Sequence, residues 1–107
     1  MSAPVLVVGA VAVLSLTLPL VVATSALELQ QRAGGAADAA ALAAADASGG
    51  WIDAEPCALA ARVAESFRVR LTHCEVDPES GIVRVVVRAT TVLGELEARA
   101  RAGPPGG

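Results

Sequence analysis

Residues 5–27 read VLVVGAVAVLSLTLPLVVATSAL and contain no charged side chain. The first charge in the chain is Glu28. A helix rises about 1.5 Å per residue, so this run would extend roughly 35 Å. A bilayer core about 30 Å thick needs about 20 apolar residues. We therefore predict a transmembrane helix over residues 1–27, with the rest of the chain displayed on one side of a membrane.

The position of this run leaves a second interpretation open. Pro19 lies inside it and would kink a helix, which membrane helices tolerate better than soluble ones. A secretory signal peptide would also lie here, and cleavage could follow Ala23 or Ala26. However, no Lys or Arg precedes the run, and the apolar stretch exceeds the usual signal length. A retained helix is the interpretation that we carry forward.

The remaining part of the chain is about 80 residues long, which is enough for one small domain with a marginal core. Trp51 and Phe67 are the only aromatic residues, so the core must be built from aliphatic side chains and alanine. All eight basic residues are arginines, the net charge is −3, and the arginines are scattered along the sequence. Without a basic stripe, we do not expect the protein to bind nucleic acid.

Residues 28–50 are predicted to form an Ala-rich helical extension that ends in a Gly linker. Ala, Leu, Gln, Glu and Arg favour a helix here, and small residues recur at three- and four-residue spacing. Small faces allow another backbone to approach closely, so Gly34, Ala37, Ala41 and Ala44 are candidate helix-packing positions. The alternative is an ordinary Ala-rich helix that packs on its own domain, and the spacing alone does not choose between them.

Residues 51–102 are predicted to form a small α+β domain. Its helix should begin between Asp53 and Pro56, because acidic residues and an early proline are typical of helix starts. Small and apolar residues then recur with helical spacing from Cys57 onwards. Cys57 should therefore lie at the start of the buried face of this helix.

Three strands should follow this helix. In residues 68–77 the apolar alternation changes phase, which indicates either a β-bulge or a late strand start near Thr72. Residues 82–91 alternate valine with arginine, and residues 95–102 alternate small or apolar residues with charged ones. We expect residues 103–107 to form a disordered tail. The predicted fold class is thus α+β, a long N-terminal helix, a short second helix and a three-stranded antiparallel sheet whose apolar face the helices cover.

The sequence offers little chemistry for catalysis. His73 adjoins Cys74, but neighbours on a strand point to opposite faces. Two cysteines and one histidine are too few for a standard zinc site. We therefore expect no enzyme, no cofactor, no metal and no small-molecule substrate.

The two cysteines lie beyond the apolar run, so a Cys57–Cys74 disulfide is expected if that side of the membrane is oxidising. The alternative is a pair of reduced, buried thiols.

A family resemblance adds to these expectations. The apolar helix, the segments AADAAALAAADAS (residues 36–48) and CALAARVAESFRVRLTHC (residues 57–74), the Val-rich strand and the ARARAGPP ending resemble the small TadE-like proteins of actinobacteria. These proteins belong with tight-adherence (Flp-type) pilus and secretion systems. The resemblance covers nearly the whole chain. The family's charged leader has no counterpart before Glu28, so no prepilin-peptidase site is assigned.

The resemblance implies a pilin-like, non-catalytic minor subunit (a pseudopilin). Its partners would be the membrane, other pilin-like subunits and an inner-membrane pilus or secretion platform. The chain would cross the cell membrane once, with an extracytoplasmic C-terminal domain. The alternative from a different class is a small membrane-tethered or secreted disulfide-stabilised binding domain unrelated to pili.

Overall fold

The computed structural model of this chain describes residues 27–104. The transmembrane helix predicted for residues 1–27 therefore lies outside the described residues, except for its last position. Between residues 27 and 104, no helix combines the length and the apolar character needed to cross a bilayer.

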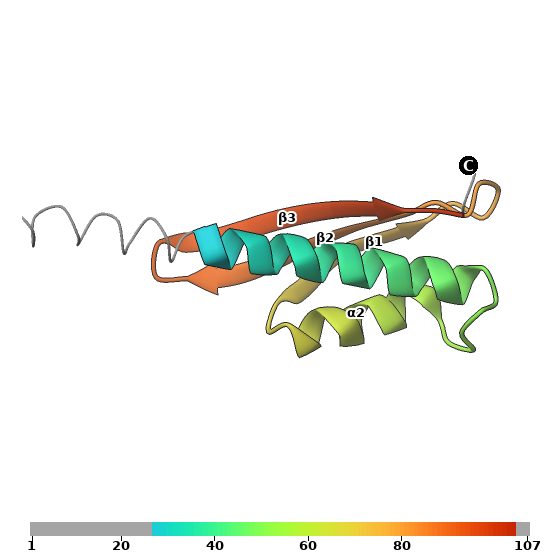
Figure 1. Ribbon diagram of the computed structural model, residues 1–107, viewed down its shortest axis with the longest axis horizontal. Coiled ribbons are helices and arrows are strands. Elements are labelled where there is room, and N and C mark those ends of the chain that lie inside the picture. Colours follow the sequence, from blue (N-terminus) through green and yellow to red (C-terminus); the bar gives the residue numbers. More distant parts are fainter. Residues whose placement is uncertain (1–26, 105–107) are drawn as a thin grey trace, which may run out of the picture.

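Residues 27–104 form two helices and a three-stranded antiparallel sheet, which confirms the predicted α+β class for this part of the chain (Figure 1). The first helix covers residues 27–48, and we call it the N-terminal helix. The other elements are α2 (Pro56–Ser66), β1 (Arg70–Val76), β2 (Val83–Thr91) and β3 (Gly94–Ala102). The strand order is β1-β2-β3, and both helices lie on the same face of the sheet. The molecule therefore has two layers and one covered sheet face.

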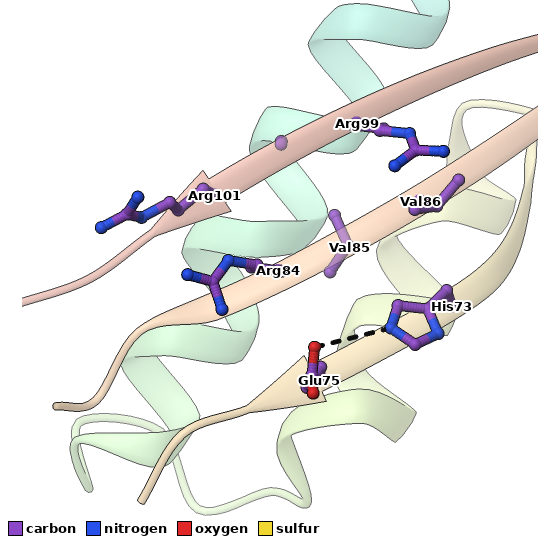
Figure 2. A pocket seen from close by; sticks show the side chains of 8 residues that line it. His73, Glu75, Arg84, Val85, Val86, Arg99 and Arg101 are labelled. Carbon is purple, nitrogen blue, oxygen red and sulfur yellow. Dashed lines mark ion pairs between the residues drawn. The ribbon is translucent and has the colours of Figure 1, made fainter. Parts of the chain in front are cut away.

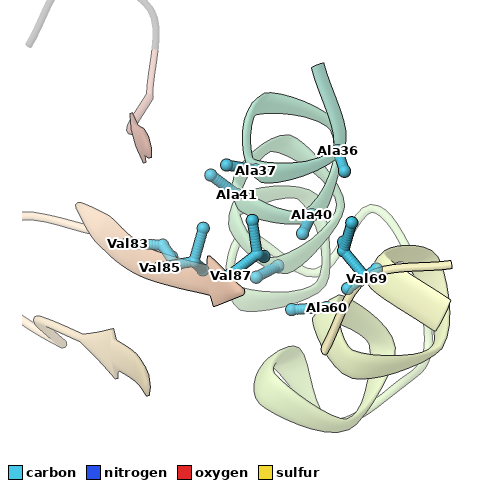
Figure 3. Close-up of a cluster of buried hydrophobic side chains, with 11 residues drawn as sticks. Ala36, Ala37, Ala40, Ala41, Ala60, Val69, Val83, Val85 and Val87 are labelled. Atoms are coloured by element: carbon cyan, nitrogen blue, oxygen red, sulfur yellow. The ribbon is translucent and has the colours of Figure 1, made fainter. Parts of the chain in front are cut away.

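The N-terminal helix covers the sheet with a stripe of alanines. Its buried positions within the core recur every three or four residues, at Ala36, Ala37, Ala40, Ala41 and Ala44, each 0% exposed. They meet the central strand, whose inward side chains are Val83, Val85 and Val87 (Figure 3). The buried side chains of this helix are all methyl groups, and the buried residues of the core as a whole are alanines and valines.

Helix α2 begins where the acidic and proline signals predicted. The Glu55 carboxylate accepts a hydrogen bond from the backbone N–H of Ala58 at 2.6 Å, and Pro56 occupies the first turn. Ala60 and Ala64 face the core. After the helix, Arg68 adopts a positive φ of 62°, which turns the chain into β1.

Of the two alternatives predicted near Thr72, the structure has the β-bulge. Leu71 pairs with Val87, but the next partner of β2, Val86, lies opposite His73, so Thr72 is the extra residue. The Thr72 hydroxyl donates to the Val86 carbonyl at 3.2 Å. The bulge moves His73 to the outer face of the sheet and Cys74 to the inner face.

The two remaining strands also lie where the alternation predicted them. Thr91 pairs with Gly94 at one end of the β2–β3 hairpin, and Val83 pairs with Ala102 at the other. Gly94 has a φ of 119°, a conformation that favours glycine, so the turn depends on it. Of the predicted tail, Gly103 and Pro104 are described and the last three residues are not.

Candidate functional site: the disulfide, the alanine stripe and the outer sheet face

The predicted Cys57–Cys74 disulfide is present and joins the first turn of α2 to β1. The Cα atoms of the two cysteines lie 5.8 Å apart, within the usual range for such a bond. The pairing depends on the bulge, because strict alternation from Leu71 would place Cys74 on the opposite face of the sheet. No thiol–imidazole pair forms: Cys74 is bonded on the inner face, and His73 lies on the outer one.

The four candidate helix-packing residues fall into two groups. Ala37, Ala41 and Ala44 are completely buried in the core that this chain forms with its own sheet. This is the packing that the second interpretation of the alanine spacing described. Gly34 is half-exposed, and a side chain built at this position would meet no atom within 4 Å. Of these four candidate positions, Gly34 is therefore the one that leaves room for a helix from another molecule.

The outer face of the sheet is charged, and its side chains form cross-strand rows. Glu97 of β3 bonds both of its neighbours: Arg88 of β2 lies 3.2 Å away and Arg99 lies 2.9 Å away. These two arginines lower the pKa of the Glu97 carboxyl, with the Arg99 hydrogen bond as the larger cause. Arg88 also reaches Glu95 at 3.5 Å. This half of the outer face is therefore an exposed network of paired charges.

The other half of the outer face is less paired. The register places Arg84 of β2 opposite both Glu75 of β1 and Arg101 of β3. The only ion pair here within residues 27–104 joins His73 Nε2 and the Glu75 carboxylate at 3.7 Å. Neither Arg84 nor Arg101 has a carboxylate within ion-pair distance in that part of the chain.

A shallow depression lies over these side chains (Figure 2). Its lining comes from all three strands and includes His73, Glu75, Arg84, Val86, Arg99 and Arg101. Guanidinium groups present several N–H donors in a plane, which suits carboxylate or phosphate groups. The depression is thus chemically suited to an acidic group on a partner, with the half-buried Val86 as an apolar floor.

Sequence reasoning missed this depression. Its signal was present, because arginine recurs every second residue at Arg99 and Arg101, and Arg84 lies near the start of the facing strand. Folding the two strands about Val92 and Leu93 would have set Arg84 opposite Arg101. To predict that His73 of β1 lines the depression, one must know at which residue the bulge lies, because the bulge decides which face of the sheet His73 occupies.

Comparisons with known proteins yielded no match: no family model, no curated protein and no solved structure resembles this chain significantly.

Proposed function

We propose that this protein is a membrane-anchored, TadE-like minor pilin or pseudopilin subunit of a tight-adherence-type pilus or secretion system, and that it acts by packing rather than catalysis. One observation carries the proposal: the described part of the N-terminal helix follows the uncharged apolar run directly in the sequence and lies along the sheet that it covers (Figure 1). A helix that leads from an apolar segment onto an antiparallel sheet is the pilin-like arrangement that the sequence resemblance implies.

Each part of the chain has a role in this proposal. The apolar run before Glu28 anchors the protein in the cell membrane as a single span. The disulfide suits a domain that lies outside the membrane in an oxidising space. Since Ala37, Ala41 and Ala44 are already covered by the sheet, lateral contacts with other pilin-like subunits would use the apolar run and the open side of the helix at Gly34.

The topology is tested with two reporters fused after Gly107. A reporter that is active only outside the membrane should be active, and one that is active only in the cytoplasm should be silent. The opposite pattern would contradict both the anchored pilin-like subunit and the extracytoplasmic domain.

The partners are tested by purifying the tagged protein from its native envelope in mild detergent. Pilin-like subunits and inner-membrane platform proteins should copurify with the wild type. Gly34→Leu should weaken this copurification without unfolding the domain, because the added side chain meets open space. Ala47→Leu, on the last helical turn, is the matched control. Equal recovery from both variants would remove Gly34 from the proposed contact.

The depression on the outer sheet face favours a second candidate function, a membrane-tethered or secreted binding domain unrelated to pili. Its arginines would hold an acidic group of a partner. The intact mass of the mature protein separates the two functions. Cleavage after Ala23 or Ala26, with release into the medium, would favour the binding domain.

A further inference from the structure

The two hairpin turns of the sheet differ in chemistry. The β1–β2 turn, residues 77–81, reads DPESG and is polar, as surface turns usually are. The β2–β3 turn instead exposes two large apolar side chains, Val92 at 102% and Leu93 at 79%. Short hairpins commonly place Asn, Asp or Gly at these positions. The apolar pair is therefore not explained by the geometry of the turn.

The β2–β3 turn is held in shape by its own hydrogen bonds. The Thr91 hydroxyl donates to the Gly94 carbonyl at 2.7 Å and accepts from the Leu93 N–H at 3.2 Å. These bonds hold the backbone on both sides of Val92, and the side chains at the tip point away from the core. The exposure of Val92 and Leu93 is thus a property of the folded hairpin.

This turn lies at the end of the molecule where the N-terminal helix begins (Figure 1). Leu27, the first described residue of that helix, is 60% exposed. Phe67, 37% exposed, lies where α2 ends, shortly before β1 starts at Arg70, which pairs with Arg88 near the end of β2. Arg32 and Arg68 line a shallow hollow together with Phe67. This end of the molecule combines exposed apolar side chains with flanking guanidinium groups.

The sequence of residues 5–27 indicates which partner this surface would meet. Residues 5–27 are uncharged and apolar, and a helix of that length is about as long as a bilayer core is thick. If it spans the membrane as proposed above, Leu27 lies at the boundary between hydrocarbon and headgroups. The hairpin tip, at the same end of the molecule, then faces that boundary.

We propose that the Val92–Leu93 turn inserts into the interface of the same bilayer that holds the apolar run, giving the domain a second membrane contact. This inference rests on the proposed membrane anchor. Arg32 and Arg68 would meet lipid phosphate groups beside the inserted turn. Two contacts separated across the width of the domain fix its tilt, so the outer sheet face is held at a set orientation relative to the membrane.

The test places an environment-sensitive fluorophore at the tip. The full-length Leu93→Cys variant is labelled at its free thiol with a nitrobenzoxadiazole probe and reconstituted into vesicles of phosphatidylcholine and phosphatidylglycerol, with or without nitroxide-labelled acyl chains. Mass measurement checks that each chain carries one label and keeps its Cys57–Cys74 bond. The matched control is Leu42→Cys, an exposed leucine on the middle of the N-terminal helix, and the native Trp51 reports on the opposite end of the domain.

The expected result is a blue-shifted emission at Leu93→Cys that nitroxide lipids quench strongly, with no quenching at Leu42→Cys or at Trp51. Vesicle flotation, measured on the same samples, reports the anchor separately. If the chain floats and the tip is not quenched, the inference fails and the anchor stands. If the labelled tip is blue-shifted but unquenched, and the thiols of unlabelled Leu93→Cys crosslink between chains, a second copy covers the turn and the lipid contact is overturned. A chain that does not float overturns both proposals.

Discussion

The two helices are attached to the same sheet in different ways. Helix α2 is joined to β1 by a covalent bond, Cys57–Cys74. The N-terminal helix has no such bond within the described residues and is held on β2 by methyl groups packed against valines (Figure 3). The comparison shows how a core with almost no large side chains remains ordered: one attachment is covalent, and the other depends on close fit.

The largest effect is expected from breaking the covalent attachment. The Cys57→Ala/Cys74→Ala variant should lose about 3 kcal/mol of unfolding free energy, because the bond closes a loop with a sequence separation of 17 residues in the unfolded chain. For a domain of this size, the melting temperature should fall by more than about 10 °C.

Hydrogen exchange sharpens this prediction. The amides of α2 should lose more protection from exchange than those of the N-terminal helix, because α2 is the one of these two helices that carries a cysteine of the bond. Adding a reductant to the wild type should reproduce the variant's melting temperature. An unchanged melting temperature in both samples would show that the bond adds nothing to stability.

The second attachment is tested on the central strand. Val85 is 1% exposed beneath the N-terminal helix, and its neighbour Val86 is half-buried on the outer face. Val85→Ala should cost about 2 kcal/mol, since it removes two methyl groups and leaves a cavity that the rigid alanine stripe cannot fill. Val86→Ala, the same chemical change on the other face, should cost less than about 1 kcal/mol. Denaturant unfolding measures both, and equal costs would contradict the close-fit attachment.

Local sequence patterns predicted most of the fold. The starts of α2 and of the strands follow from capping residues and alternation, and the phase change in residues 68–77 marked an irregularity near Thr72 that is a bulge in the structure. The alanine stripe was ambiguous for a physical reason. A methyl group fits equally well against a helix of another molecule or against a valine of the same chain, so spacing at Ala37, Ala41 and Ala44 could not identify the partner.

The depression on the outer face was harder to predict because it depends on contacts between strands. Arg84 and Arg101 are far apart in the sequence, and only the hairpin register brings them together. A carboxylate opposite in the register does not by itself pair an arginine there: Arg84 lies opposite Glu75 without an ion pair to it, whereas Arg88 lies opposite Glu97 and bonds it at 3.2 Å. Alternation alone predicts an outward charge but not its partner.

The smallest effect concerns the outer face, which neither attachment uses. Hydrogen bonds from Arg99 and Arg88 hold the pKa of the Glu97 carboxyl below its ordinary value of 4.5. A carboxyl whose pKa is lower in the folded state stabilises the fold above its ordinary pKa, and this contribution is lost as the pH falls through the folded value. The wild type should therefore lose melting temperature between about pH 5 and about pH 3 more steeply than Glu97→Gln does.

The matched control for this titration is Glu79→Gln, because Glu79 forms no ion pair within residues 27–104. The pKa of Asp77 is also lowered, mainly by a hydrogen bond from the Ser80 hydroxyl and to a smaller extent by one from the Glu79 N–H. The wild type and Glu97→Gln therefore both retain a second acid-sensitive group. Glu79→Gln keeps that backbone donor and should follow the wild-type curve. Since Glu97 is exposed and paired on the surface, salt should weaken the difference between wild type and Glu97→Gln. If Glu97→Gln and Glu79→Gln titrate alike, the paired network on the outer face contributes nothing to folding, and the stability of the domain resides in its two helix attachments.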